Sequence, residues 1–186
     1  MIRVMNFPKR KSIRLQRYDY SQSGFYFITI CTQNHLCLFG EIDKNGSMKR
    51  NPAGDMIEKW WHELDNKYPP VFLHDHIVMP NHFHGIIQLN HSNELAEHDA
   101  YSTIKPTTSL EIPSISTMVG WFKTMTVNEY IRNVKSNNWR PFRNRLWQRN
   151  YYEHVIRDED AWLEISEYIR TNPLRWVDDK YYRNAK

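Results

Sequence analysis

The order in which strand-like and helix-like patterns follow one another most constrains the fold of this 186-residue chain. The patterns run from two strands to a helix, then to two extended segments, a second helix, a further strand and a terminal helix. This order favours an α+β sandwich, in which an antiparallel sheet has its helices packed mainly on one face. The length predicts a single domain over 1–186, large enough to bury a core.

The extended segments are marked by β-branched and aromatic residues. GFYFITICT predicts a strand over 24–32, and LCLFGEI, which follows the turn QNH, predicts its hairpin partner. Asn45-Gly46 indicates a second tight turn. VFLHDHIVM and HFHGIIQL predict two more extended segments, joined through Pro80-Asn81, and RLWQRNYYEHVI predicts the last strand.

Apolar spacing and terminal signals predict three helices. Asn51-Pro52 begins the first, whose apolar residues recur at helical spacing as far as a Tyr-Pro-Pro stop. Ser116 or Thr117 is expected to cap the second, which runs to about Lys135. DEDAWLEISEYIRT predicts the third, with acids at its start and Asn172-Pro173 at its end.

Composition excludes several classes of protein. No stretch approaches the ~18 apolar residues of a membrane span. The basic start MIRVMNFPKRKSIRLQR has no apolar signal core, so a cytoplasmic protein without a secretion signal is expected. Cys31 and Cys37 are interpreted as reduced thiols, with a cross-strand pair as the alternative. Residues 91–115 lack periodicity and predict an exposed loop, long enough to be an insertion or a functional loop.

The net charge of +4 is unevenly distributed along the chain. A basic arm occupies 1–20, and arginines alternate with aromatic residues in WRPFRNRLWQRNYY. Guanidinium groups bind phosphates and aromatic rings stack on unpaired bases, a combination that suits single-stranded nucleic acid. The alternatives are a solvated arm and a strand whose aromatic residues belong to the core. The candidate DNA contacts are Arg10, Lys11, Arg14, Arg17, Lys123, Arg143, Arg145 and Arg149. For Lys123, a solvated side chain without a DNA contact is an equal alternative.

Two histidines in HFHG are candidate metal ligands. His82 and His84 flank Phe83, and alternate side chains of a strand share a face. Both imidazoles are therefore expected to point one way, toward one metal ion, while Phe83 packs into the core. His74 and His76 have the same spacing, but an aspartate without a buried anchor lies between them, so the second pair is preferred. The alternative is a pair of histidines on an exposed sheet face.

The terminal helix supplies further candidate groups in EYIRTNP. Tyr168 and Asn172 are four residues apart and therefore neighbours on one helical face. A tyrosine oxygen can act as a nucleophile on phosphorus, and an amide oxygen can complete a set of metal ligands. Taken alone, Tyr168 is better interpreted as a tyrosine at the edge of the core. The nucleophile is favoured only when this helix and the HFH strand are considered together.

Several segments resemble a known family of enzymes. VMPNHFHGII resembles the metal-binding strand of the HUH single-tyrosine transposases, in which two histidines flank a hydrophobic residue. RLQRYDYSQSGFYFITICT and LWQRNYYEHVIRDEDAWLEISEYIRTNP resemble the branch called REP-associated tyrosine transposases, which are encoded singly and handle short palindromic repeats. The resemblance runs from about Ile13 to Trp176, nearly the whole chain.

The resemblance implies a ferredoxin/RRM-like HUH nuclease fold. It implies that His82 and His84 bind the metal, that Tyr168 is the nucleophile and that Asn172 is the third ligand, a position where many relatives carry glutamine or another polar residue. The implied cofactor is Mg²⁺ or Mn²⁺, which polarises the scissile phosphate. The implied product is a 5′-phosphotyrosine bond and a free 3′-hydroxyl, from which DNA is rejoined.

The expected partner is single-stranded or hairpin DNA, and the expected enzyme is a single-tyrosine transposase with endonuclease and strand-transfer activity. Relatives include homodimers that complete each active site with the partner's tyrosine helix, and monomers that do so within one chain. Two other functions remain open. One is a nucleic-acid-binding module of the same fold without catalysis. The other is a zinc hydrolase that uses His74, His76, His82 and His84 together with a water nucleophile.

Overall fold

The computed structural model of the protein describes residues 22–69, 71–90 and 113–182. The basic arm with Arg10, Lys11, Arg14 and Arg17 lies outside the described residues, as does almost all of the expected loop at 91–115. The elements in chain order are β1 (Gly24–Cys31), η1 (Gln33–His35), β2 (Gly40–Ile42), β3 (Met48–Arg50), α1 (Pro52–Lys67), β4 (Val71–Met79), β5 (His82–Leu89), α2 (Ile115–Ser136), β6 (Tyr152–Ile156), α3 (Glu159–Thr171) and η3 (Asn172–Asp178).

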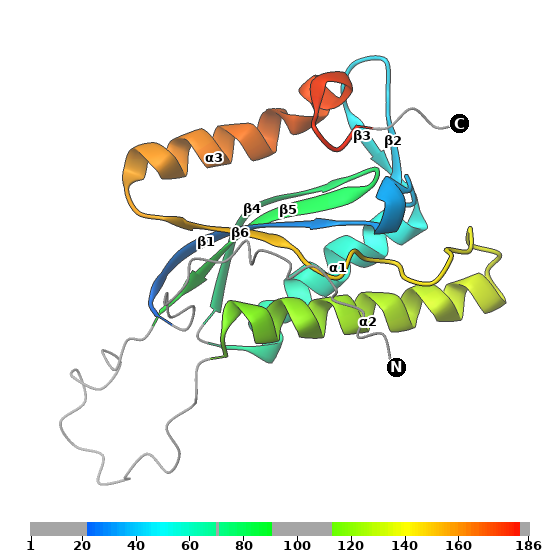
Figure 1. Cartoon of the computed structure of the whole chain (residues 1–186), viewed down its shortest axis with the longest axis horizontal. Coiled ribbons are helices and arrows are strands. Elements are labelled where there is room, and N and C mark those ends of the chain that lie inside the picture. The colour runs from blue at the N-terminus through cyan, green and yellow to red at the C-terminus, as the bar shows by residue number, and fades with distance from the viewer. Residues whose placement is uncertain (1–21, 70, 91–112, 183–186) are drawn as a thin grey trace, which may run out of the picture.

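Four strands form one antiparallel sheet in the order β4-β5-β1-β6. Helices α1 and α2 lie on one face of this sheet, and α3 lies on the opposite face (Figure 1). The expected α+β class with an antiparallel sheet is confirmed, and two of the three helices share a face as expected. The third helix covers the other face, where it can reach side chains that α1 and α2 cannot.

The central strand β1 is apolar on both faces because both faces are covered. Tyr26, Ile28 and Ile30 belong to the large core cluster beneath α1 and α2. Phe27 points the other way and belongs to a smaller cluster with Ile169 of α3. A strand buried on both sides has a continuous hydrophobic sequence rather than an alternating one.

The helices begin where side-chain caps satisfy their first backbone N–H groups. The Asn51 side chain accepts from the backbone N–H groups of Ala53 and Gly54, as the sequence predicts. The cap of α2 is Ser114, which accepts from the Thr117 N–H, so this helix begins slightly earlier than expected. Asp158 caps α3.

The expected hairpin between 24–32 and LCLFGEI is wrong. Only Gly40–Ile42 of that segment is a strand, and it pairs with β3 to form a separate two-stranded sheet. Asn34 and His35 have φ angles of 59° and 54°, and this left-handed turn carries the chain away from β1. Both edges of β1 are occupied by β5 and β6 instead. The tight turn at Asn45-Gly46 is confirmed between β2 and β3.

The last predicted strand is also shorter than RLWQRNYYEHVI. Only Tyr152–Ile156 forms β6, and before it Trp147 makes a single bridge to Thr32. Cys31 and Cys37 are free thiols. Among the described helices, none has the length and apolar character required to cross a membrane.

Candidate metal centre and nucleophile

The two histidines of β5 lie on the face of the sheet that α3 covers. Phe83 points away from them into the main core, with its ring centroid 4.7 Å from that of Trp61 and 5.5 Å from that of Phe122. His82 and His84 are 0% and 1% exposed, and their ring centroids are 4.5 Å apart. The predicted alternation is confirmed, and the alternative of two histidines on an exposed face is wrong.

Hydrogen bonds fix which nitrogen of His82 carries its proton. The Asn81 side-chain amide donates to the backbone carbonyls of His35 and Tyr181, so its Oδ1 acts as an acceptor. This oxygen lies 2.8 Å from His82 Nδ1, which must therefore donate to it. His84 Nδ1 lies 2.8 Å from Thr29 Oγ1, and the same tautomer lets it donate there. Both rings can thus present an unprotonated Nε2, and a partner on the other nitrogen is usual for histidines that bind metals.

Burial keeps both imidazoles in the form that metal binding requires. Loss of hydration lowers the pKa of His82 to about 4, against an opposing effect of the Asp179 carboxylate. Burial also lowers the pKa of His84 well below its usual value, and the neighbouring His82 lowers it further. The rings are therefore neutral at neutral pH, so a metal ion has no proton to displace from them.

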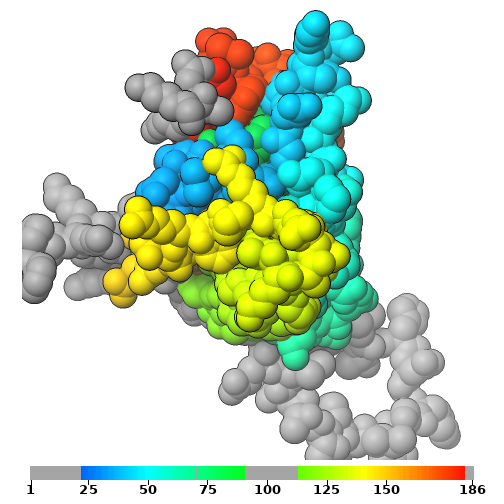
Figure 2. Space-filling view, turned by 90° about the vertical axis from the view of Figure 1, so that its right-hand side faces the viewer, coloured from blue at the N-terminus to red at the C-terminus, as the bar shows by residue number. Residues whose placement is uncertain are grey.

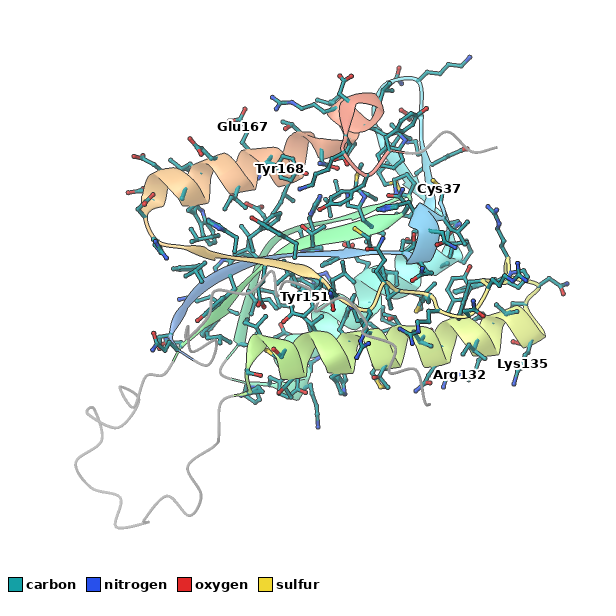
Figure 3. All side chains as sticks on the ribbon, viewed as in Figure 1. Cys37, Arg132, Lys135, Tyr151, Glu167 and Tyr168 are labelled. Carbon is teal, nitrogen blue, oxygen red and sulfur yellow. The ribbon has the colours of Figure 1, made fainter. Side chains whose placement is uncertain are left out.

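Helix α3 places Tyr168 over this pair. Trp162, Ile165 and Ile169 anchor the helix against the sheet, and Tyr168 lies on its sheet-facing side, with Glu167 on the outer side (Figure 3). The Tyr168 hydroxyl is 3.4 Å from His84 Nε2. Burial raises the pKa of Tyr168 to about 12, and the nearby Asp179 carboxylate adds to this effect.

Asn172 is buried beside the histidines at the junction of α3 and η3. The expected end at Asn172-Pro173 is where the α-helix stops, but the chain continues as a 3-10 helix. The Asn172 side-chain amide donates to Asp179 Oδ2 at 3.1 Å. Within the described residues, neither Asn172 Oδ1 nor His82 Nε2 has a hydrogen-bond partner.

These unpartnered atoms fit a metal ion. Buried polar atoms without a partner are rare and costly, and here both carry lone pairs rather than protons. Asn172 lies close enough to His82 to influence the pKa of its ring, and His84 Nε2 faces the same space from the neighbouring position on β5. The donors present, two imidazole nitrogens and an amide oxygen, suit Mn²⁺, while Mg²⁺ prefers oxygen ligands.

The sequence did not identify Asp179 as part of the site. A ligand atom of Asp179 lies within 4.8 Å of ligand atoms of His82 and His84. Asp179 follows η3 in a polar stretch without periodicity, and its place beside the histidines comes from the fold, which also brings it to Asn172. Tyr181 was missed for the same reason, although its ring lies 4.8 Å from that of His82.

The first histidine pair does not join this site. The pairing of β4 with β5 is irregular between Leu73 and His76. His74 consequently contacts Trp162 on the α3 side, whereas His76 contacts Trp61 on the opposite side. The four histidines do not form one cluster, so the zinc hydrolase that requires them together is wrong.

The described candidate DNA contacts lie along the irregular segment before β6. Arg143, Arg145 and Arg149 are exposed there, and the segment forms a ridge beside α2 (yellow in Figure 2). Lys123 is partly buried, and its ammonium donates to the backbone carbonyls of Gln148, Arg149 and Asn150, at 3.0 Å for the first. A groove of about 390 Å³ lies between this segment and α2.

Known proteins resemble this chain in sequence and in fold. No family model matches it. An uncharacterized protein of Haemophilus influenzae is 37% identical over 179 residues, which cover 93% of both proteins. The chain belongs to the family of that protein. A second Haemophilus influenzae protein, which carries the provisional name REP-associated tyrosine transposase, is 22% identical over 91% of the chain and 86% of its own length.

A solved structure shares the fold. It is a REP-associated tyrosine transposase bound to a REP hairpin, with a TM-score of 0.53 and 16% identity over 87% of this chain and 73% of that one. The resemblance to the REP-associated tyrosine transposases is therefore confirmed, in sequence by one match and in fold by the other.

Proposed function

We propose that the protein is a metal-dependent nuclease of the HUH single-tyrosine type, which nicks and rejoins single-stranded DNA at hairpins through a 5′-phosphotyrosine intermediate. The observation that carries the proposal is the position of the Tyr168 hydroxyl, 3.4 Å from His84 Nε2. A nucleophile for phosphorus and donors for a metal thus meet in one partly buried site. Because Tyr168 reaches the histidines of its own chain, the site needs no second copy.

His82, His84 and Asn172 would hold the metal, with Asp179 orienting the Asn172 amide. When bound, a divalent ion polarises the scissile phosphate and stabilises the charge that develops on it. The protein contributes the rest by fixing both imidazoles through their Nδ1 atoms, keeping them neutral and excluding water from their Nε2 atoms.

Tyr168 carries the covalent step. Its oxygen bonds to phosphorus while the bond from phosphorus to the preceding nucleotide's 3′-oxygen breaks. The phenol proton is lost and the departing 3′-oxygen gains one, so the proton count is unchanged. The phosphodiester is exchanged for a phosphotyrosine ester, and attack by a 3′-hydroxyl reverses the step. Because burial raises the pKa of Tyr168 to about 12, the free protein holds this phenol protonated at neutral pH.

The irregular segment before β6 would bind the DNA strand. Its exposed arginines suit phosphates. Trp139 and Phe142 pack edge-on against the buried Tyr130, and the parts of their rings that stay exposed would stack on bases. Lys123 supports this segment from below through backbone carbonyls, so its expected role changes from direct DNA contact to positioning of the arginines. The bound REP hairpin of the structural neighbour supports a hairpin substrate.

The deciding experiment mixes the protein with labelled hairpin oligonucleotides and Mn²⁺, and seeks a covalent adduct on a denaturing gel. Tyr168→Phe should bind the hairpin and form no adduct. Tyr152→Phe is the matched control, since Tyr152 lies on the same face of the sheet, is 38% exposed and packs on Phe27. A covalent adduct formed by Tyr168→Phe would show that another tyrosine is the nucleophile.

A second pair of variants tests the metal ligands. His82→Ala should abolish cleavage while hairpin binding persists, because phosphate and stacking contacts elsewhere provide affinity. His74→Ala, whose ring packs on Trp162 outside the site, should retain cleavage. Hairpin binding without any cleavage in the wild type would instead support the non-catalytic binding module.

A further inference from the structure

A second cluster of metal-binding side chains lies on the other face of the sheet, apart from Tyr168. Glu58 and His62 are one turn apart on α1, and His76 projects toward them from β4. His76 Nε2 lies 3.2 Å from Glu58 Oε1, and His62 Nε2 lies 3.9 Å from the same oxygen. One donor atom from each residue lies within 4.8 Å of the other two.

The tautomer of His76 means that its contact with Glu58 requires a positive charge. Its Nδ1 is 3.1 Å from the backbone carbonyl of His74, an acceptor only, so Nδ1 carries a proton. In the neutral ring the lone pair of Nε2 then faces the Glu58 carboxylate. Both groups are hydrogen-bond acceptors, so they repel each other. The contact is favourable when a proton or a metal ion supplies the positive charge.

One of the ligand separations already matches a tetrahedral ion. Zinc holds nitrogen and carboxylate oxygen at about 2.0–2.1 Å, which places neighbouring tetrahedral ligands about 3.3 Å apart. The Glu58–His76 separation of 3.2 Å already agrees with this value. His62 is the farther ligand, and its side chain is 58% exposed. It can approach by a rotamer change without disturbing the core.

The surroundings orient the carboxylate and leave room for a fourth ligand. Arg50 Nη1 binds Glu58 Oε2 at 2.9 Å, which leaves Oε1 directed at the histidines. The guanidinium charge opposes a cation, but Arg50 is shared with Asp55, whose carboxylate lies 3.0 Å from its Nε. Glu58 and His76 also line a hollow of about 740 Å³ between the β2–β3 hairpin, α1, the edge strand β4 and the α3–η3 junction.

We propose that Glu58, His62 and His76 form a second metal site, a zinc site with two histidines and one glutamate that ties α1 to β4. Two imidazoles and one carboxylate favour Zn²⁺ over Mg²⁺. The sheet separates this site from the one at His82 and His84, so the two bind metal independently, and the proposal does not depend on DNA cleavage.

The test uses the full chain carrying His82→Gln and His84→Gln, so that the first site is disabled. Isothermal titration with Zn²⁺ should show one bound equivalent. Adding His62→Gln or His76→Gln should weaken Zn²⁺ binding by more than about tenfold. Loss of an outer-shell partner alone weakens metal binding about 10–100-fold, and these two residues are the proposed ligands themselves. His154→Gln is the matched control, because His154 is exposed on β6.

Thermal unfolding gives a second readout. Zn²⁺ should raise the Tm of the His82→Gln/His84→Gln protein, because a ligand that binds only the folded state stabilises it. The rise should disappear with His62→Gln, which changes an exposed side chain and leaves the fold intact even if His76→Gln does not. No Zn²⁺ binding in the parent, or unchanged binding in His62→Gln, would overturn the proposal.

Discussion

Replacing Asp179 with alanine tests whether the histidine site is held by its surroundings as well as by its ligands. Asp179 Oδ2 accepts from the Asn172 side-chain amide at 3.1 Å, and Oδ1 accepts from the Tyr181 backbone N–H at 2.6 Å. The first bond turns the Asn172 carbonyl oxygen toward the site. Without it, the amide can rotate and present its N–H groups to the metal, which repel a cation.

The magnitude follows from this geometry. Loss of an outer-shell hydrogen bond lowers metal affinity about 10–100-fold, equivalent to about 1.4–2.8 kcal/mol. Loss of the Asp179 charge acts in the same direction, because this carboxylate lies close to His82 and His84. We therefore expect the upper part of that range for Asp179→Ala. Asp179→Asn keeps one acceptor but turns an NH₂ group toward the other of its two donors, the Asn172 amide and the Tyr181 N–H. It also lacks the charge, so it should recover only part of the affinity.

The assay is titration of Mn²⁺ into each variant, followed by calorimetry. Asp178→Ala is the matched control, since Asp178 is the exposed neighbour of Asp179. An affinity change below about twofold in Asp179→Ala would refute the positioning role. A loss as complete as that in His82→Ala, without recovery in Asp179→Asn, would identify Asp179 as a ligand itself.

Three further predictions concern stability and DNA binding. Gly85→Ala should destabilise the protein by about 1–3 kcal/mol in urea unfolding, because the added Cβ would lie 2.6 Å from ring carbons of the buried Trp61. The folded-state pKa of Lys123 is about 8, below its usual 10.5, so the unfolded chain holds more protons than the folded chain between these pH values. The free energy of unfolding of the wild type should therefore rise by about 2 kcal/mol from pH 8 to 10, relative to that of Lys123→Met. Arg145→Ala and Arg149→Ala should each reduce the salt dependence of hairpin binding by about 0.7 in log–log slope, and an unchanged slope would remove that arginine from the interface.

Local patterns predicted most elements because local physics determines them. Asn51 caps α1, and Asp158 caps α3, through hydrogen bonds within three residues of the cap. The alternation around Phe83 likewise depends only on the geometry of a strand. The face of each residue in HFHG could thus be predicted, and with it the partnership of His82 and His84.

Strand pairing could not be predicted in the same way, because it depends on distant partners. β1 pairs with β5 and β6, which lie far along the chain, and not with the segment that follows it. The apolar character of both faces of 24–32 did contain a signal. Phe27 and Ile28 point to opposite faces and both are buried, so the sequence required cover on both sides of the sheet.

The irregularity in β4 was equally invisible in the sequence. HDH has the same spacing as HFH, yet only a strand with regular pairing places alternate residues on one face. The bulge near His74 and His76 sends them to opposite faces. Asp179 was missed because its role depends on a 3-10 turn that returns the chain over β5, and no periodicity marks such a turn.

One face of the sheet carries most of the hydrophobic core, and the other carries the candidate site. The face under α1 and α2 buries the large cluster around Trp61 and Phe122, whereas the α3 face buries a smaller one around Phe27 and Ile169. Tyr168 and the proposed metal ligands all lie on the second face, so their placement depends on the smaller cluster. Truncations on the first face should therefore appear mainly as lost stability. Ile169 anchors α3 one residue after Tyr168. Replacing Ile169 with alanine should therefore displace the proposed nucleophile and reduce adduct formation even under conditions where the protein stays folded.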